Sequence, residues 1–277
     1  MKTLATSYAP YQVRTHNAST QSENRMHSDD VARQFGFKGG LVPGVTVFAH
    51  MTQPLAARYG EAWLARGTAE VSFAKPAYEG EWLSIHTTDA NDGTHALTCL
   101  NVQGEQGIEL ARMRATLPAT PLQADTRGDI APAPPLLERP TVTWDLMEIN
   151  QPFPALAWTP ARDDNIEWCD DVRDALPLYR EGTSPLLHPG LILRQANFAL
   201  RKRFIIPAWI HAASRITFFE PLRVGPDYEV RTIPEEKWKH KGHEFVRLYV
   251  AVRCGERTVT EILHTAIFRP RVRDGNN

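Results

Sequence analysis

The stretch Leu41-Val42-Pro43-Gly44 decides the fold, because it opens a mostly apolar run to Tyr59 and then recurs in the second half of the chain. The second copy, Leu187-His188-Pro189-Gly190, opens a similar run that ends at Phe204. A Pro-Gly pair marks a turn, and a long apolar run after it is typical of a buried helix. The recurrence predicts that one structural unit is built twice.

Downstream of the two copies, the halves keep the same order and spacing of similar blocks. The matching blocks are residues 71–76 with 216–221, Gly80 with Gly225, and 115–118 with 266–270. The first two pairs lie 145 positions apart, and the spacing then drifts by a few residues. This drift predicts a longer hairpin in the second half, around residues 238–243.

Within each half, the pattern predicts one buried helix followed by several antiparallel strands. Apolar residues recur at helical spacing at Val45, Phe48, Met51, Leu55 and Tyr59. Residues 70–73 alternate polar and apolar side chains, and residues 245–252 are rich in aromatic and β-branched side chains, as strands are. Both patterns together favour an α+β fold.

A segment rich in proline and alanine separates the halves. Residues 119–140 favour extended backbone and form a good linker. We therefore predict an N-terminal unit over residues 1–118, a linker over 119–140 and a C-terminal unit over 141–277.

Composition and charge exclude several classes of protein. The chain has 277 residues, 42% of them hydrophobic, and a formal net charge of −1, which gives no sign of binding to nucleic acid or to an anionic membrane. Its three cysteines are an odd number without metal-site or disulfide spacing, so reduced thiols are expected. No run resembles a signal peptide or a membrane span, so we expect a cytoplasmic protein.

This layout resembles the hot-dog fold, in which a curved antiparallel sheet wraps a long helix. More specifically, it resembles the double hot-dog proteins of the MaoC-like family, which includes (R)-specific enoyl-CoA hydratases and 3-hydroxyacyl thioester dehydratases. The family's hydratase loop reads approximately Asp-x-Asn-Pro-(apolar)-His-x-Asp. The corresponding residues here are Ser22-Glu23-Asn24-Arg25-Met26-His27-Ser28-Asp29, of which Ser22 and Arg25 depart from the pattern.

The resemblance implies roles for several of these residues. His27 takes the place of the acid/base histidine, Asn24 is a further candidate catalytic residue of the loop, and Asp29 is a candidate substrate-binding residue. Gly44, with the neighbouring Val45, takes the place of the helix start whose N–H groups hold the thioester oxygen. Such a donor suits a charge that develops at a helix N-terminus.

Ser22 stands where the family has its catalytic aspartate. A serine hydroxyl is too weak an acid and too weak a base to serve as an ordinary general base. Glu23 is one residue away and would substitute if the loop were shifted by one position. Ser22 and Glu23 are therefore both candidates for the missing role.

The second half contains a degenerate copy of the same loop. Residues 165–172 align with residues 24–31, and Trp168 replaces His27. The sequence therefore predicts one active site, in the first unit, with the second unit supplying a wall for the acyl chain.

Three basic residues, Arg201, Lys202 and Arg203, end the second predicted helix. Cations at a helix C-terminus are favourable in themselves, and the alternative is contact with CoA phosphates or an acidic acyl carrier protein. No set of His, Cys, Asp and Glu has metal-site spacing, so we expect no metal and no cofactor beyond the CoA or phosphopantetheine of the substrate. Pairing of two chains into a homodimer is a further expectation.

The sequence is consistent with three functions. The first is hydration or dehydration of a 2-enoyl/3-hydroxyacyl thioester, with His27 as acid/base and Gly44 as oxyanion donor. The second keeps the fold and changes the reaction to that of a thioesterase, or of a diverged isomerase or cyclase, because Ser22 replaces the aspartate. The third is a non-catalytic module that binds an acyl ligand.

Overall fold

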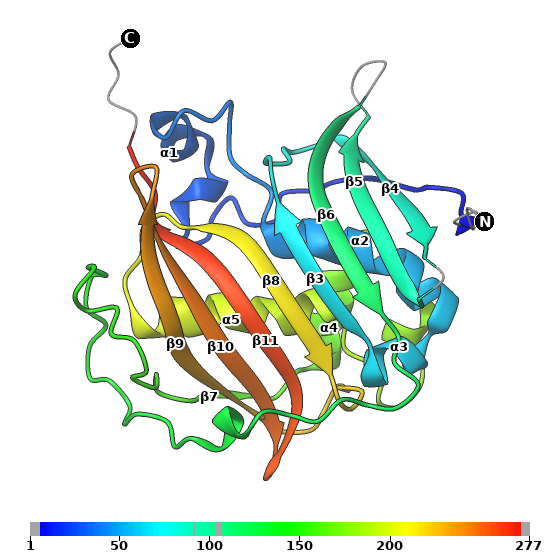
Figure 1. Ribbon diagram of the computed structural model, residues 1–277. Helices are drawn as coiled ribbons and strands as arrows, with labels where there is room; N and C mark the ends of the chain where they lie inside the picture. The colour runs from blue at the N-terminus through cyan, green and yellow to red at the C-terminus, as the bar shows by residue number, and fades with distance from the viewer. Residues whose placement is uncertain (1–5, 91, 103–106, 273–277) are drawn as a thin grey trace.

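In the structure, a computed structural model that describes residues 6–90, 92–102 and 107–272, a long curved sheet packs over two helices (Figure 1). The helical elements are η1 (Arg25–His27), α1 (Asp29–Gln34), α2 (Gly44–Tyr59), α3 (Glu61–Arg66), η2 (Thr126–Asp129), α4 (Arg162–Asp171), η3 (Pro177–Tyr179) and α5 (Pro189–Arg203). The strands are β1 (Thr6–Ser7), β2 (Tyr11–Arg14), β3 (Thr68–Phe73), β4 (Trp82–Asp89), β5 (Thr94–Asn101), β6 (Ile108–Thr116), β7 (Leu156–Trp158), β8 (Ile210–Phe218), β9 (Tyr228–His240), β10 (His243–Cys254) and β11 (Arg257–Arg269).

The two units share one continuous sheet. Its 11 strands follow the order β1-β4-β5-β6-β3-β8-β11-β10-β9-β7, with β2 also paired to β4. The units meet where β3 pairs antiparallel with β8, in a register that places Thr68 opposite Thr217. The helices α2 and α5 therefore lie side by side on one face of a single sheet (Figure 1).

The hairpin formed by β9 and β10 confirms the expected longer connection in the second half. These strands have 13 and 12 residues, against 8 each for their counterparts β4 and β5. Lys241 and Gly242 form its tip with φ of 50° and 80°, the left-handed conformation that a tight hairpin turn requires. The extra length is what shifts the spacing between the two copies.

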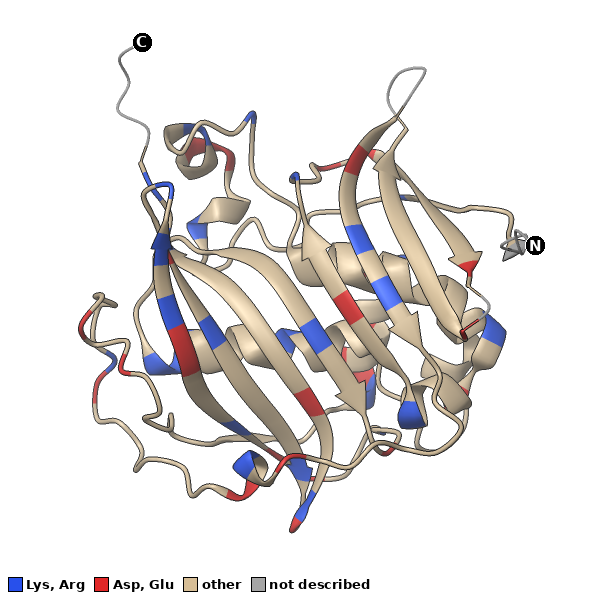
Figure 2. Ribbon diagram, in the orientation of Figure 1, with Lys and Arg blue, Asp and Glu red and all other residues tan. Residues whose placement is uncertain are grey.

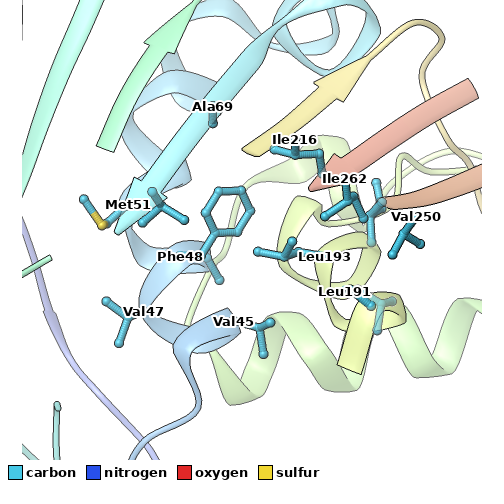
Figure 3. Close-up of a cluster of buried hydrophobic side chains, with 14 of the residues drawn as sticks. Val45, Val47, Phe48, Met51, Ala69, Leu191, Leu193, Ile216, Val250 and Ile262 are labelled. Carbon is cyan, nitrogen blue, oxygen red and sulfur yellow. The ribbon is translucent and has the colours of Figure 1, made fainter. Parts of the chain in front are cut away.

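The core lies between the two long helices and the sheet. Both helices start at the repeated Pro-Gly pair, where proline fixes a φ compatible with the first turn and donates no N–H. Figure 3 shows Phe48 of α2 and Leu193 of α5 pointing toward one another, with Ile216 of β8 above them. All three are fully buried, so this cluster joins the two units.

We expect truncation of Phe48 to destabilise the fold, because its ring is fully buried in the cluster shared by both units. Phe48→Ala should lower the free energy of unfolding by about 3–5 kcal/mol, since the lost apolar contact adds to the cost of a cavity. Urea unfolding measures the change. The control is Leu137→Ala, at a fully exposed position, which should shift the free energy by less than about 0.5 kcal/mol.

The segment predicted to be a linker, residues 119–140, packs along the second unit. The guanidinium of Arg253 on β10 donates a 2.8 Å hydrogen bond to the Gly128 carbonyl and forms a 2.6 Å ion pair with Asp129. A Cβ on Gly128 would lie 2.6 Å from Thr258 Oγ1, so glycine allows the close approach. The connection between units is therefore fixed to the sheet.

Charged residues of both signs are spread along the strands and the surrounding loops (Figure 2). This mixture agrees with the net charge of −1. No helix in the described part of the chain is long and apolar enough to cross a bilayer.

Candidate active site

A cavity of about 240 Å³ opens where the two units meet. The first unit contributes His27 and Gly44 to its lining, and the second unit contributes Asn197 of α5 and Trp209 and His211 at the start of β8. The structure thus brings the predicted histidine and glycine into one cavity. It also adds polar residues from the second unit, which was expected to provide only a wall.

The loop that carries His27 is fastened to the second unit through Asn24. The amide oxygen of Asn24 accepts from the backbone N–H groups of Trp209, at 3.1 Å, and of Met26, at 3.3 Å. Its amide nitrogen donates to the Trp209 carbonyl at 3.0 Å and lies 3.1 Å from Nε2 of His27. Asn24 therefore lines the cavity beside His27 and positions that ring through its hydrogen bonds.

These contacts determine the protonation of His27. Because the backbone contacts fix the Asn24 amide, its nitrogen is the donor to Nε2, and Nε2 must present a lone pair. Nδ1 lies 2.7 Å from the Leu41 carbonyl and must be the protonated nitrogen. Burial lowers the pKa of His27 below its ordinary value, partly offset by the Leu41 carbonyl, so His27 is a neutral base near pH 7.

The three carboxylate or hydroxyl candidates of the loop point elsewhere. Ser22 Oγ donates to the Asn24 carbonyl at 3.2 Å. Glu23 bonds to the Arg139 guanidinium, which lowers the pKa of that carboxyl. Asp29 accepts from the Gly40 N–H at 2.8 Å, which lowers its pKa and shapes the turn before α2. Among the described residues, no carboxylate oxygen lies within 4.0 Å of a His27 ring nitrogen.

The N-terminus of α2 is open toward the cavity. Pro43 precedes it without a side-chain cap, and in the described structure the N–H groups of Gly44 and Val45 have no hydrogen-bond partner. A Cβ on Gly44 would lie 2.7 Å from Nδ1 of His211, so only glycine allows these two groups to approach. The Val45 side chain packs in the core and does not line the cavity.

A chain of polar side chains in the second unit runs behind His211. Its Nε2 lies 2.7 Å from Ser214 Oγ, which lies 3.0 Å from Nδ1 of His264 on β11. All three are buried, and burial lowers the pKa of His264 to about 3 and that of His211 well below its ordinary value. Sequence reasoning missed this group, because only the pairing of β8 with β11 brings residues fifty positions apart into contact.

In the second unit, the N-terminus of α5 corresponds to that of α2, but side chains of its own unit occupy it. Nδ1 of His188 accepts from both the Gly190 N–H, at 3.0 Å, and the Trp168 indole, at 3.2 Å. Nε2 of His188 faces the buried Asp174 carboxylate at 3.3 Å. A Cβ on Gly190 would lie 2.9 Å from Trp168, whose ring fills the space.

The basic cluster at the end of α5 is engaged in local contacts. Arg201 pairs with Glu23 at 3.6 Å and lies over the Phe198 ring, and Arg203 lies over Phe204. Neither Arg201, Lys202 nor Arg203 lines the cavity. No group of three or more His, Cys, Asp or Glu residues in the described ranges is placed to hold a metal ion.

The buried histidines predict acid-sensitive stability. The pKa of His50, hydrogen-bonded to Thr15, and that of His264 are each about 3 because of burial, whereas an unfolded histidine titrates near 6.5. Below pH 6.5 the unfolded chain therefore binds more protons than the folded one, and stability falls as the pH falls. Each of these two residues should contribute about 1 kcal/mol per pH unit to the slope between about pH 6 and 5, and His211, whose pKa burial also lowers, adds to it.

Urea unfolding at pH 7.5, 6.5, 6.0 and 5.0 measures this slope. His50→Leu should lower the slope by about 1 kcal/mol per pH unit, because one of the groups with a lowered pKa no longer titrates. An unfolding free energy that does not change between pH 6.0 and 5.0 would show that these histidines accept protons in the folded state.

No protein-family model matches the sequence, and no curated protein matches it. Solved structures do match. A MaoC domain protein dehydratase from Chloroflexus aurantiacus has a TM-score of 0.64 and 13% identity, covering 97% of this chain and 96% of that one. A Mycobacterium tuberculosis protein described as having a double hotdog fold has a TM-score of 0.63 and 14% identity, covering 96% of both chains.

A structure described as an oleoyl thioesterase from Lactobacillus plantarum also aligns, with a TM-score of 0.51 and 8% identity over 96% of this chain and 98% of that one. At these identities the likeness concerns the fold. The chain has the double hot-dog fold, and the predicted resemblance to MaoC-like double hot-dog proteins is confirmed at that level.

Proposed function

We propose that this protein is a hydratase or dehydratase acting on a 2-enoyl/3-hydroxyacyl thioester. The observation that supports this most directly is a single cavity that holds a neutral histidine base, His27, and an uncapped helix N-terminus at Gly44. A thioester carbonyl placed at Gly44 would gain from the free N–H groups and the helix dipole. The fold shared with a MaoC domain dehydratase agrees with this reaction.

The reaction balances with His27 as the only base. In hydration, the oxygen of a water molecule bonds to C3 of the enoyl group while its proton passes to Nε2 of His27. The C2–C3 π electrons move toward the thioester, whose oxygen is held at Gly44. The proton then passes from Nε2 to C2, and dehydration is the reverse. During the transfer the Asn24 amide releases its hydrogen bond to Nε2.

The cavity walls favour an apolar acyl group. Side chains of Met26, Phe37, Val47 and Phe73 line it, and none of them offers a hydrogen bond. The thioester would be carried by CoA or by the phosphopantetheine of an acyl carrier protein.

The test is to incubate the protein with crotonyl-CoA and with longer 2-enoyl-CoA substrates. Hydration removes the conjugated double bond, so the enoyl absorbance falls, and the reverse reaction from 3-hydroxyacyl-CoA restores it. If the absorbance stays constant for every chain length, the hydratase proposal is wrong for CoA substrates. Repeating the assay with enoyl-acyl carrier protein then decides between the two carriers.

The absence of a carboxylate beside His27 in the described structure favours a second candidate, a thioesterase or a diverged isomerase or cyclase. His27 would activate a water molecule for attack on the thioester carbonyl, with Gly44 again binding the oxyanion. Release of free thiol from acyl-CoA identifies a thioesterase. Ligand binding without any turnover, unaffected by loss of His27, identifies a non-catalytic acyl-binding module.

A further inference from the structure

His211 at the start of β8 is a polar residue of the cavity that the reaction described above does not use. The residue is only 8% exposed, it lines the cavity, and Nδ1 has no hydrogen-bond partner among the described residues. A buried polar atom without a partner is costly unless a ligand satisfies it. The atom lies beside Gly44, since a Cβ there would be 2.7 Å from Nδ1.

The chain behind His211 decides which of its nitrogens carries the proton. The Ser214 hydroxyl has one hydrogen and lies between Nε2 of His211 and Nδ1 of His264, so it donates to one ring and accepts from the other. If it donated to His264, an N–H on Nε2 of His264 would be buried with no acceptor, because that atom has no partner. If it donates to His211, the N–H without a partner is at Nδ1 of His211, beside Gly44.

The second arrangement is the more favourable one, because His211 lines the cavity, where a ligand can bind, and His264 does not. Orphaned buried N–H groups are rarer and costlier than orphaned acceptors, so the fully enclosed His264 nitrogen is better left as a lone pair. Nδ1 of His211 lies beside Gly44, whose N–H has no partner in the described structure, and both residues line the cavity.

We propose that His211 is the second donor of the oxyanion hole: Nδ1–H of His211 and the N–H of Gly44 together bind the carbonyl oxygen of the acyl thioester. This rests on the proposed function, since it names the group that completes the same site. The donor comes from the second unit, so the duplicated half takes part in catalysis. Ser214 and His264 are positioning residues that hold the proton on Nδ1.

The chemistry requires no proton transfer from His211. As the water molecule adds at C3, negative charge develops on the thioester oxygen, and two hydrogen bonds to that oxygen strengthen. A neutral imidazole serves this purpose in other enzymes when its pKa is kept low. Burial holds the pKa of His211 well below its ordinary value, so the ring stays neutral and keeps its orientation.

The first experiment compares His211→Leu with His211→Asn in the enoyl-CoA assay. Loss of one oxyanion donor lowers kcat about 100-fold or more in other enzymes, and we expect this for leucine with KM changed far less. In His211→Asn, the amide N–H of asparagine takes a place near that of Nδ1–H, so kcat should be higher than in His211→Leu. The control is His50→Leu, which removes an equally buried ring outside the cavity and should retain kcat. A kcat retained in His211→Leu would overturn the proposal.

The positioning residues are tested by Ser214→Ala, which frees the tautomer of His211. We expect kcat to fall by less than in His211→Leu while KM stays nearly constant. A purely structural role would instead lower the amount of folded protein and leave kcat per folded molecule unchanged.

A second experiment separates failure of this proposal from failure of the proposed function. Butanoyl-CoA labelled with ¹³C at the carbonyl has no double bond to hydrate, so its infrared carbonyl band reports binding alone. The band should shift to lower frequency in the wild-type protein and return toward the solution value in His211→Leu. A shift in both proteins would refute the role of His211, whatever the reaction. A shift that needs His211, without any enoyl turnover, would refute the hydratase and leave the oxyanion hole intact.

Discussion

Replacing His27 with alanine should lower kcat/KM by about 1,000-fold, with the folded structure preserved. In the proposed reaction the imidazole of His27, which lines the cavity, is the base, and general acid–base groups contribute 100- to 10,000-fold, so about 1,000-fold lies within that range. Nε2 is held by Asn24 and Nδ1 by the Leu41 carbonyl, so the ring is already neutral and oriented. The measurement is initial rate against concentration for crotonyl-CoA, or for the best substrate found.

The matched control is His16→Ala. His16 lies in the same N-terminal segment but is exposed and pairs with Glu79, so its loss should leave kcat/KM within about twofold of wild type. His27→Ala should lower kcat/KM for hydration and for thioester hydrolysis alike, because both proposed reactions use His27 as the base. Full activity in His27→Ala would exclude every reaction that uses this histidine and favour the acyl-binding module.

Much of the fold could be predicted because the duplication is visible in the sequence itself. The Pro-Gly pairs at Pro43 and Pro189 begin α2 and α5, and the shifted spacing located the long β9–β10 hairpin. These features depend on local residues whose order survives in both copies. The antiparallel joining of β3 to β8 has no such local signal, because strand partners depend on packing of the whole chain.

Only the part of the candidate site that belongs to a short sequence motif could be predicted. His27 and Gly44 were found because both lie in the first unit, within a recognisable loop and helix start. Ser22 and Glu23 were proposed for the missing acid, yet Ser22 bonds to the loop backbone and Glu23 to Arg139. A side chain's direction depends on tertiary partners that sequence spacing does not contain.

Trp168 contributes to the different state of the helix start in the second unit. Its indole donates to His188, which also accepts the N–H of Gly190, so the second helix start is capped from within. In the first unit the corresponding N–H of Gly44 is free within the described structure, and a His ring from the other unit approaches it. The difference between the copies is therefore the state of the helix N-terminus as much as the loss of a histidine.

This difference gives the second prediction, that Gly44→Ala should abolish most of the activity. The new methyl would lie 2.7 Å from Nδ1 of His211 and 3.0 Å from its Cβ and Cγ, so either the ring or the helix start must move. The ring is packed against Phe73 at 4.7 Å and His264 at 4.4 Å between centroids, which resists its displacement. We expect kcat to fall about 100-fold and the free energy of unfolding to fall by about 1–3 kcal/mol.

Gly190→Ala separates the two effects, because the same substitution is made at the same place in the other copy. Its methyl would lie 2.9 Å from Ala49 Cβ and from Trp168, so a similar loss of about 1–3 kcal/mol in the free energy of unfolding is expected. The N–H of Gly190 is bonded to His188, so no substrate oxygen binds there and kcat should be unchanged. Equal losses of kcat in both variants would mean that Gly44 acts only through packing. A loss confined to Gly44→Ala would place the thioester oxygen at the first helix start, because in the described structure the N–H of Gly44 has no partner whereas that of Gly190 is bonded to His188.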